Sequence, residues 1–347
     1  MIFLGRSLVL RPKIFRLIAF LVSLFGVLVC VEVFLRFFLP VRFCDAMETF
    51  RHDPELGVSF VPSLHVLQTT DYQQEVKINQ LGTVNFQEDF TRFKSLVFAV
   101  GDSFTQGVGL PADASYPAQL DLVLNIRDGS YEALFGVVNL GMGGYGGMQN
   151  ILQLKKYTQR LGRPDFILYL GCQNDPQDDE MFRRGERHRA IFSNTPGMNA
   201  FWKIRLWITR QTEIGKRARL AWGRFRGAGS MAMVPDSAGS AFSSQIENLR
   251  EAARCAYESK AILVVSWASD DADYQAMKKW AKEQNIGFAD WAPTVRSLLQ
   301  SNPNLPLDNP HSGGHYRTWI NTIIAKTFAK IILTNAPIPA QRNPAVR

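Results

Sequence analysis

Short apolar runs alternate with longer amphipathic stretches from residue 95 to near the C-terminus. A short apolar run is typical of a buried strand, and a longer stretch with its apolar residues on one face is typical of a helix. The predicted strands are 95–100, 136–140, 166–170, 261–267 and 286–290. The predicted helices are 116–125, 148–161, 242–259, 271–284 and 317–333. This alternation predicts an α/β fold, with a parallel sheet covered by helices on both faces.

The N-terminal segment differs because it is apolar on all sides. No charge occurs from Leu17 to Val31, and the apolar stretch extends from Ile14 to Leu39, interrupted at Arg16, Glu32 and Arg36. That length can cross a hydrocarbon core about 30 Å thick. The alternative is a cleavable signal peptide, but its apolar core would be shorter and small residues would follow it, whereas bulky residues follow here. We therefore predict an uncleaved signal anchor that forms a transmembrane helix.

Basic residues flank this span unequally. Those before it are Arg6, Arg11, Lys13 and Arg16, and those that follow it are Arg36, Arg42 and Arg51. The excess favours an N-terminus in the cytoplasm, because basic flanks are retained there. We therefore expect a single-pass protein of the cytoplasmic membrane whose remaining residues lie outside it, in the periplasm or at the cell exterior.

The pattern divides the chain into four parts. Residues 1–40 are the anchor, and residues 41–94 form a juxtamembrane connector with some strand and turn character. Residues 95–335 form the α/β domain, which an insertion at about 176–240 interrupts. The Pro- and Ala-rich tail at 336–347 is expected to be frayed.

The insertion is basic and aromatic, which explains the net charge of +8 on the whole chain. Within 181–229 the acidic residues are Glu186 and Glu213. The basic residues are Arg183, Arg184, Arg187, Arg189, Lys203, Arg205, Arg210, Lys216, Arg217, Arg219, Arg224 and Arg226. The aromatic residues are Phe182, Phe192, Phe201, Trp202, Trp207, Trp222 and Phe225. Such interleaving on helices suits a membrane interface, so contact with anionic lipid or polymer is one expectation. The alternative is a solvated cap with a small aromatic core, and nucleic-acid binding is not expected outside the cytoplasm.

Composition adds two exclusions. The chain of 347 residues is 46% hydrophobic and 20% charged, which fits a globular protein with an added apolar segment. Its cysteines, Cys30, Cys44, Cys172 and Cys255, form no CxxC pair and have no histidine nearby at metal-binding spacing. Neither a zinc site nor a disulfide framework is therefore expected. The acidic cluster Asp178–Glu180 lacks such a histidine too, and we expect it to be a solvated loop.

The segment Gly101–Gly107, with the sequence GDSFTQG, directly follows the predicted strand 95–100. A serine just past a strand, among small and polar residues, can lie on a sharp turn with its hydroxyl exposed. A helix that begins there points backbone N–H groups at any nearby negative charge. Serine nucleophiles of acyl-transfer enzymes need that setting. Taken alone, the segment fits a tight turn with a helix N-cap equally well.

Three further segments favour the catalytic interpretation. The four segments, in chain order, are Gly101–Ser103, Asn139–Gly146, Gly171–Asp175 and Asp308–His311. Together they resemble the four motif blocks of the SGNH (GDSL) hydrolase superfamily, whose members are Ser-His-Asp esterases, lipases, thioesterases and carbohydrate deacetylases. The resemblance covers roughly residues 95–175 and 260–335, and it implies a flavodoxin-like three-layer α/β/α sandwich. The first three blocks fall at the carboxyl ends of predicted strands, where ligands bind in open α/β sheets.

The resemblance implies a catalytic triad. Ser103 would be the nucleophile and His311 the base, with Asp308 three residues before the histidine to orient its imidazole. His315 is the alternative base, but Ser312 rather than a carboxylate stands three residues before it. We expect His315 to begin the last helix instead.

The resemblance also implies an oxyanion hole formed by the Ser103 N–H, the Gly144 N–H and the side-chain amide of Asn174. Donors fixed around a tetrahedral intermediate can each stabilise the transition state by about 3 kcal/mol. Gly143 is the nearest alternative to Gly144, and Asn174 could instead cap the turn after its strand. The third block is one residue longer than the shortest form in the family.

The predicted function is therefore ester hydrolysis through an acyl-serine intermediate, without a cofactor or a metal. The expected location favours an acyl ester of an envelope glycan, polymer or lipid as the substrate. Transfer of the acyl group to a sugar hydroxyl is an alternative reaction. A catalytically inactive member that binds glycan or acts as a scaffold is the alternative that is not an enzyme.

Overall fold

The protein is described here from a computed structural model. The described residues are 12–39, 43–44, 49–68, 74–127, 129–185, 204, 208, 212–226, 240–309 and 314–336. The chain divides into two compact units, which are Met1–Phe43 with Met198–Phe225, and Cys44–Gly197 with Arg226–Arg347. All of the predicted site residues belong to the second unit.

A five-stranded parallel sheet forms the centre of the second unit. Its strands are β6 (Ser95–Gly101), β9 (Phe135–Asn139), β10 (Phe166–Gly171), β11 (Ile262–Trp267) and β12 (Gly287–Phe288). Their order is β12-β11-β10-β6-β9, which is 2-1-3-4-5 from β9 to β12 and therefore flavodoxin-like. Every residue of β6 and β10 is buried, as expected of central strands covered on both faces. The predicted α/β fold with a parallel sheet is confirmed.

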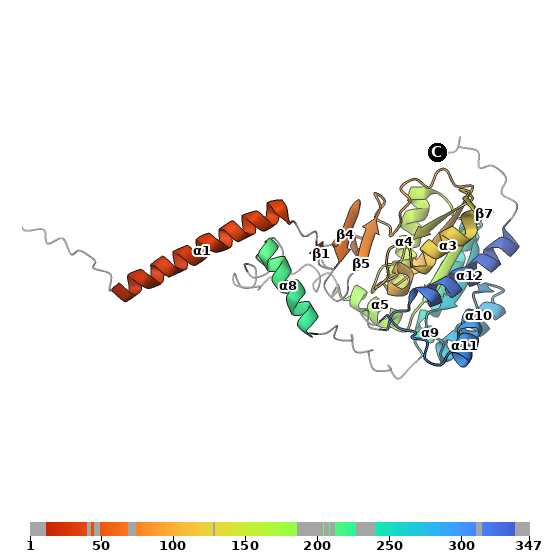
Figure 1. Cartoon of the computed structure of the whole chain (residues 1–347). Coiled ribbons are helices and arrows are strands. Elements are labelled where there is room, and N and C mark those ends of the chain that lie inside the picture. Colours follow the sequence, from red (N-terminus) through yellow and green to blue (C-terminus); the bar gives the residue numbers. More distant parts are fainter. Residues whose placement is uncertain are drawn as a thin grey trace, which may run out of the picture. The chain divides into compact units, whose positions relative to one another are not determined.

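Helices cover the two faces of the sheet. The chain adds β9 on one side of β6 and then adds β10, β11 and β12 on the other side. Right-handed crossovers therefore place the helices before and after this change on opposite faces of the sheet. On one face α3 (Tyr116–Asn125) packs against α12 (Thr318–Asn335), with α11 (Ala292–Ser301) beside α12 (Figure 1). On the other face α9 (Ala241–Ser259) contacts both α4 (Gly147–Leu161) and α10 (Ala272–Glu283). The result is a three-layer α/β/α sandwich.

The predicted elements match the observed ones closely. The predicted helix 116–125 coincides with α3, and the other four predicted helices differ from α4, α9, α10 and α12 by at most two residues at either end. The predicted strand 286–290 is reduced to the two residues of β12. Helix α11 was not predicted, although Pro293 in its first turn is a helix-start signal.

The segment after β10 departs from its prediction. The acidic cluster Asp178–Glu180 is not a solvated loop, because it lies within helix α5 (Asp175–Arg183) and both Asp178 and Asp179 are buried. Pro176 in the first turn and acidic residues near the N-terminus are signals for a helix start. The sequence favours a solvated loop because the burial of these acidic residues depends on contacts with residues far away in the chain.

Residues 49–94 pack on the loop that follows β9. They contain two antiparallel hairpins, β2 (Phe50–Asp53) with β3 (Gly57–Phe60), and β4 (Leu64–Gln68) with β5 (Gln74–Ile78), while β1 (Phe43–Cys44) lies beside β4. Apolar side chains of this segment form a core cluster with Met142 and Tyr145. They are Leu56, Val58, Phe60, Val76 and Ile78 from the hairpins and Val84 from the chain after β5. The hairpins therefore pack against the second motif block.

Among its described residues, the first unit contains one long apolar helix and part of the basic insertion. Helix α1 (Pro12–Phe38) is long and apolar enough over Lys13–Phe38 to cross a membrane, which confirms the predicted apolar helix. Helix α8 (Glu213–Arg226) comes from the insertion. Of the segment 181–229, the residues 186–203, 205–207, 209–211 and 227–229 lie outside the described residues, as does the predicted tail from 337 onward.

Candidate active site

Ser103 lies at the carboxyl end of β6, a strand flanked on both sides by β9 and β10. Strand β6 ends at Gly101, and the short helix α2 (Ser103–Gln106) begins at Ser103. Asp102 caps this helix: its Oδ1 accepts from the Phe104 N–H at 2.9 Å. The Ser103 hydroxyl is half-buried and donates to Asp102 Oδ2 at 3.2 Å. The serine is therefore held on a strand-to-helix turn, as the sequence predicts.

The sharpness of this turn depends on Gly101. Its φ of +156° lies in a region that L side chains rarely adopt, and a Cβ there would lie 2.7 Å from the Leu170 carbonyl oxygen on β10. The same Cβ would overlap the Thr105 side chain. A glycine is thus required for the chain to turn from β6 into α2 against the neighbouring strand.

The second motif block lies directly against α2. Asn139 Oδ1 accepts from the Gly141 N–H at 2.9 Å, and a Cβ on Gly141 would lie 2.5 Å from the Thr105 carbonyl carbon. A Cβ on Gly143 would be 3.5 Å from Ser103 Cβ. The predicted second block is therefore adjacent to the predicted nucleophile.

Hydrogen bonding distinguishes the two glycines proposed as oxyanion donors. The Gly143 N–H donates to Gln106 Oε1 at 2.6 Å. Gly144 has a left-handed φ of +71°, and its N–H donates to no group among the described residues. The Ser103 N–H also has no acceptor among the residues that the structure describes. Gly144 rather than Gly143 thus keeps a backbone donor that the described protein groups do not use.

Asn174 lies between β10 and α5. Its side-chain nitrogen donates to Asp178 Oδ2 at 2.6 Å, and its carbonyl accepts from the Asp178 N–H at 3.0 Å. One amide hydrogen is therefore directed at α5, while the amide nitrogen carries a second hydrogen. Asp178 orients the Asn174 side chain that the sequence assigns to the oxyanion hole.

Burial controls the ionisation of the neighbouring third-block residues. Asp175 is fully buried, and its Oδ2 accepts from the Cys172 N–H at 3.1 Å. Burial, followed by the nearby charge of Asp102, raises the pKa of Asp175 well above its usual range. Burial and Asp102 also raise the pKa of the Cys172 thiol. Cys172 therefore stays a thiol and does not compete as a nucleophile.

One buried carboxylate that the sequence analysis missed connects three helices. Asp179 on α5 accepts from the Met148 N–H of α4 at 2.8 Å, from Gln245 Nε2 at 3.0 Å and from Asn248 Nδ2 at 2.9 Å. Both Gln245 and Asn248 lie on α9. Asp179 thereby fixes α5, and with it the Asn174–Asp178 pair, to the second layer of helices. No local signal in the sequence marks these partners.

The fourth segment approaches the site from the loop before α12. Asp308 pairs with Tyr316 in an antiparallel bridge, and the Asn309 N–H donates to the His315 carbonyl at 2.8 Å. The Asn309 side-chain amide donates to the carbonyl of Gly109, in the turn after α2. His311 lies outside the described residues. Both ends of the loop that carries it are tied to the region around Ser103.

His315 lies next to the residue that follows the predicted nucleophile. The centroid of its ring is 5.0 Å from that of Phe104, and the Tyr316 ring lies 5.1 Å from the same ring. The Tyr316 hydroxyl donates to the Ala268 carbonyl, just past the end of β11, at 2.6 Å. A histidine ring is therefore present beside α2, and it belongs to the residue that the sequence analysis kept as the alternative base.

The described residues also include cysteine thiols and side chains that could bind metal. Within the described ranges, no group of three or more His, Cys, Asp or Glu residues could hold a metal ion. Cys30, Cys172 and Cys255 are free thiols.

Comparison with known proteins finds a likeness among solved structures. No protein-family model matches the chain, and no curated protein matches it. The chain is similar to a solved structure from Veillonella parvula DSM 2008, described as a member of the lipolytic protein G-D-S-L family, at 12% identity and a TM-score of 0.39. The match covers 69% of this chain and 98% of that one. Likeness at this level does not identify an activity or a site.

Proposed function

We propose that the protein is a serine esterase that hydrolyses acyl esters through an acyl-serine intermediate. The observation that carries the proposal is the position of Ser103 at the end of a central strand, with the glycine-rich second block against it. The two backbone N–H groups of Ser103 and Gly144, neither with a partner among the described residues, support the same conclusion. Donors of this kind are what a developing oxyanion requires.

The reaction would proceed in two steps. In the first, the base removes the proton from Ser103 Oγ, which attacks the ester carbonyl carbon, and the oxyanion accepts hydrogen bonds from the N–H groups of Ser103 and Gly144 and from the Asn174 amide. The leaving alcohol takes a proton from the base as the tetrahedral intermediate collapses. In the second step, the base removes a proton from a water molecule, which attacks the carbonyl carbon of the acyl-serine. The bond from that carbon to Ser103 Oγ then breaks, the base returns the proton to Oγ, and the acid is released.

His311 is proposed as the base, oriented by Asp308. The loop contacts of Asn309 with Gly109 and of Tyr316 with Ala268 support a base from this segment. His315 is the second candidate, favoured by its ring contact with Phe104. Both assignments use the same nucleophile, so they differ only in which histidine is indispensable.

The proposed location is the outer face of the cytoplasmic membrane. Helix α1 supports an anchor, and the basic residues before it support an N-terminus in the cytoplasm. On this view the substrate is an acyl ester of an envelope glycan, polymer or lipid. Transfer to a sugar hydroxyl is the alternative outcome, and it depends on how well the site excludes water.

A fluorophosphonate probe tests the proposal directly. The full chain should be labelled, Ser103→Ala should not be labelled, and its turnover of a p-nitrophenyl ester should fall by at least about a thousandfold. Ser297→Ala, which removes an exposed hydroxyl on α11, is the matched control and should behave as the wild type. Labelling that persists in Ser103→Ala, or no labelling of a wild type with a normal circular dichroism spectrum, would overturn the proposal. Adding a sugar acceptor and analysing the products separates hydrolysis from transfer.

A further inference from the structure

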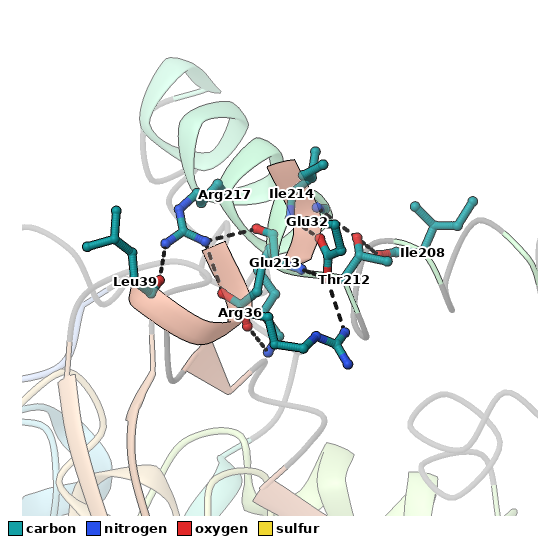
Figure 2. A network of polar contacts seen from close by, with 10 residues as sticks. Glu32, Arg36, Leu39, Ile208, Thr212, Glu213, Ile214 and Arg217 are labelled. Atoms are coloured by element: carbon teal, nitrogen blue, oxygen red, sulfur yellow. Dashed lines mark hydrogen bonds and ion pairs between the residues drawn. The ribbon is translucent and has the colours of Figure 1, made fainter. Parts of the chain in front are cut away.

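The end of the apolar helix α1 is hydrogen-bonded to the beginning of α8, although the two are far apart in the sequence. The carboxylate of Glu32 on α1 accepts from the Glu213 N–H at 2.9 Å and from the Ile214 N–H at 3.0 Å (Figure 2). The first N–H groups of a helix have no partner within the helix. A carboxylate satisfies them and also interacts favourably with the positive end of the helix dipole. Glu32 thus acts as a remote N-terminal cap for α8.

Further contacts connect the first two turns of α8 to the same end of α1. The Glu213 side chain is only 7% exposed and accepts from Lys216 Nζ at 3.0 Å and Arg217 Nη1 at 2.9 Å. Arg217 also donates to the carbonyl of Leu39, at the end of α1, as Figure 2 shows. Glu32 is paired with Arg36 at 3.1 Å on its own helix. Each of these charged groups therefore has a charged or backbone partner within this part of the chain.

The position of Glu32 along α1 determines the depth at which α8 begins. Glu32 is the first charged residue after the uncharged run Leu17–Val31 and lies six residues before the end of α1, about 9 Å along the helix axis. An ionised carboxylate in the hydrocarbon core is costly, so Glu32 belongs at the boundary of the core. A helix capped by Glu32 therefore begins at the level of the lipid headgroups.

The residue pattern of α8 suits that level. Apolar residues recur along the α8 sequence at spacings of three and four, at Ile214, Ala218, Ala221 and Phe225, and basic residues stand between them. Apolar residues on one face with arginines beside them are characteristic of helices that lie in the plane of a membrane interface. The five basic residues against Glu213 as the acidic one are complementary to anionic lipid headgroups.

We propose that α8 is a membrane-surface helix, that its arginines bind the phosphate groups of anionic lipids, and that Glu32 positions it there. The partner is the bilayer that α1 crosses, because α8 begins at the end of that helix. Each basic residue near an anionic surface contributes about fivefold to surface affinity. The interaction would hold the α8 part of the basic insertion at the membrane, whichever reaction the second unit performs.

A depth measurement in the full chain tests this proposal. A fluorophore sensitive to polarity is attached at Ala221→Cys, with Cys30→Ala and Cys44→Ser removing two thiols, while Cys172 and Cys255 are buried. The protein is placed in nanodiscs of phosphatidylcholine with or without phosphatidylglycerol and with a quencher on the lipid chain. We expect strong quenching in the anionic discs and a loss of quenching of at least about fivefold when Arg219, Arg224 and Arg226 are changed to glutamine. The matched charge control is Arg250→Gln with Arg254→Gln and Lys279→Gln, three exposed basic positions on α9 and α10.

Variants of Glu32 test its positioning role. Glu32→Ala removes both acceptors and should abolish the lipid-dependent quenching, whereas Glu32→Gln keeps one acceptor and should give an intermediate value. Thermal unfolding of the second unit should be unchanged in both, which separates lost positioning from misfolding. A label that is unquenched in anionic discs, or quenching that is equal in wild type and Glu32→Ala, would overturn the proposal. A response to soluble dextran sulfate but not to phosphatidylglycerol would overturn it in favour of an anionic polymer as the partner.

Discussion

The candidate active site has two halves that are built differently. One half, containing Ser103, Gly144 and Asn174, consists of turns that follow directly on the buried parallel strands β6, β9 and β10. The other half lies between helices α11 and α12, where the structure describes Asp308, Asn309 and residues 314–316. The first half is positioned by backbone close contacts, such as that of Gly141 with α2, and the second is tied to it by side-chain hydrogen bonds and ring contacts.

The two halves therefore differ in how precisely the fold positions their residues. Parallel strands in register bring their carboxyl ends to one edge, so residues just after them meet with little freedom. The segment before α12 has no such strand register, and it carries both candidate bases, His311 and His315. Substitutions in each half test this contrast, and the largest effect is expected from the histidines.

The two histidines should differ strongly. If His311 is the base, His311→Ala should eliminate ester hydrolysis, and His315→Ala should only weaken it. Loss of a base removes general acid–base catalysis, whereas loss of a ring contact or a loop hydrogen bond costs about 1 kcal/mol. Measured kcat/KM values should therefore differ by well over tenfold between the two variants.

The reverse result would make His315 the base and would contradict the Asp308-x-x-His311 interpretation. Substantial activity in both variants would mean that neither histidine is the base. Ser103→Ala provides the reference for complete loss in the same assay.

Gly141→Ala should disturb the strand-end half directly. Its Cβ would meet the backbone of Thr105 and Gln106 on α2, which cannot move without displacing Ser103. We expect a loss of unfolding free energy of about 2–3 kcal/mol, within the range seen for overpacked buried sites. The matched control is Gly287→Ala on β12, where the nearest atom to a new Cβ is Val264 Cγ2 at an ordinary 3.4 Å. Equal midpoints of urea unfolding for the two variants would contradict the close contact.

Asn309→Ala should weaken the loop half with a smaller effect. It removes the side-chain hydrogen bond to the Gly109 carbonyl, whose loss should lower the unfolding free energy by about 1 kcal/mol. Because this bond ties the loop to the turn after α2, kcat should fall several-fold while the structure stays folded. Circular dichroism and esterase kinetics on the same preparation measure both effects. Unchanged kcat would show that the loop is positioned by the contacts of Tyr316 instead.

Much of the fold could be predicted because its signals are local. The strands β6 and β10 are unbroken apolar runs. Helices α4 and α9 have apolar residues at helical spacing. They end at Gly162 and Lys260, whose backbone conformations do not continue a helix. Helix α5 is not evident from the sequence because a run of acidic residues is normally exposed to solvent. Asp179 is buried because it accepts hydrogen bonds from Gln245 and Asn248 on α9. The hairpins at residues 49–78 were only partly predicted, since their short strands are stabilised by packing on Met142 and Tyr145.

By itself, the sequence determined the order of strands and helices, the apolar N-terminal helix, and the position of the serine in a turn after a strand. These features depend on residues that are neighbours in the chain, and hydrophobic periodicity and turn chemistry record them. Only the tertiary structure decided that Gly143 is bonded to Gln106 while Gly144 is not, that Asp179 connects three helices, and that Glu32 caps a helix that begins 181 residues later. Those outcomes depend on which polar groups, distant in the chain, come into contact when the apolar surfaces are buried. The local pattern of a single sequence does not show these contacts.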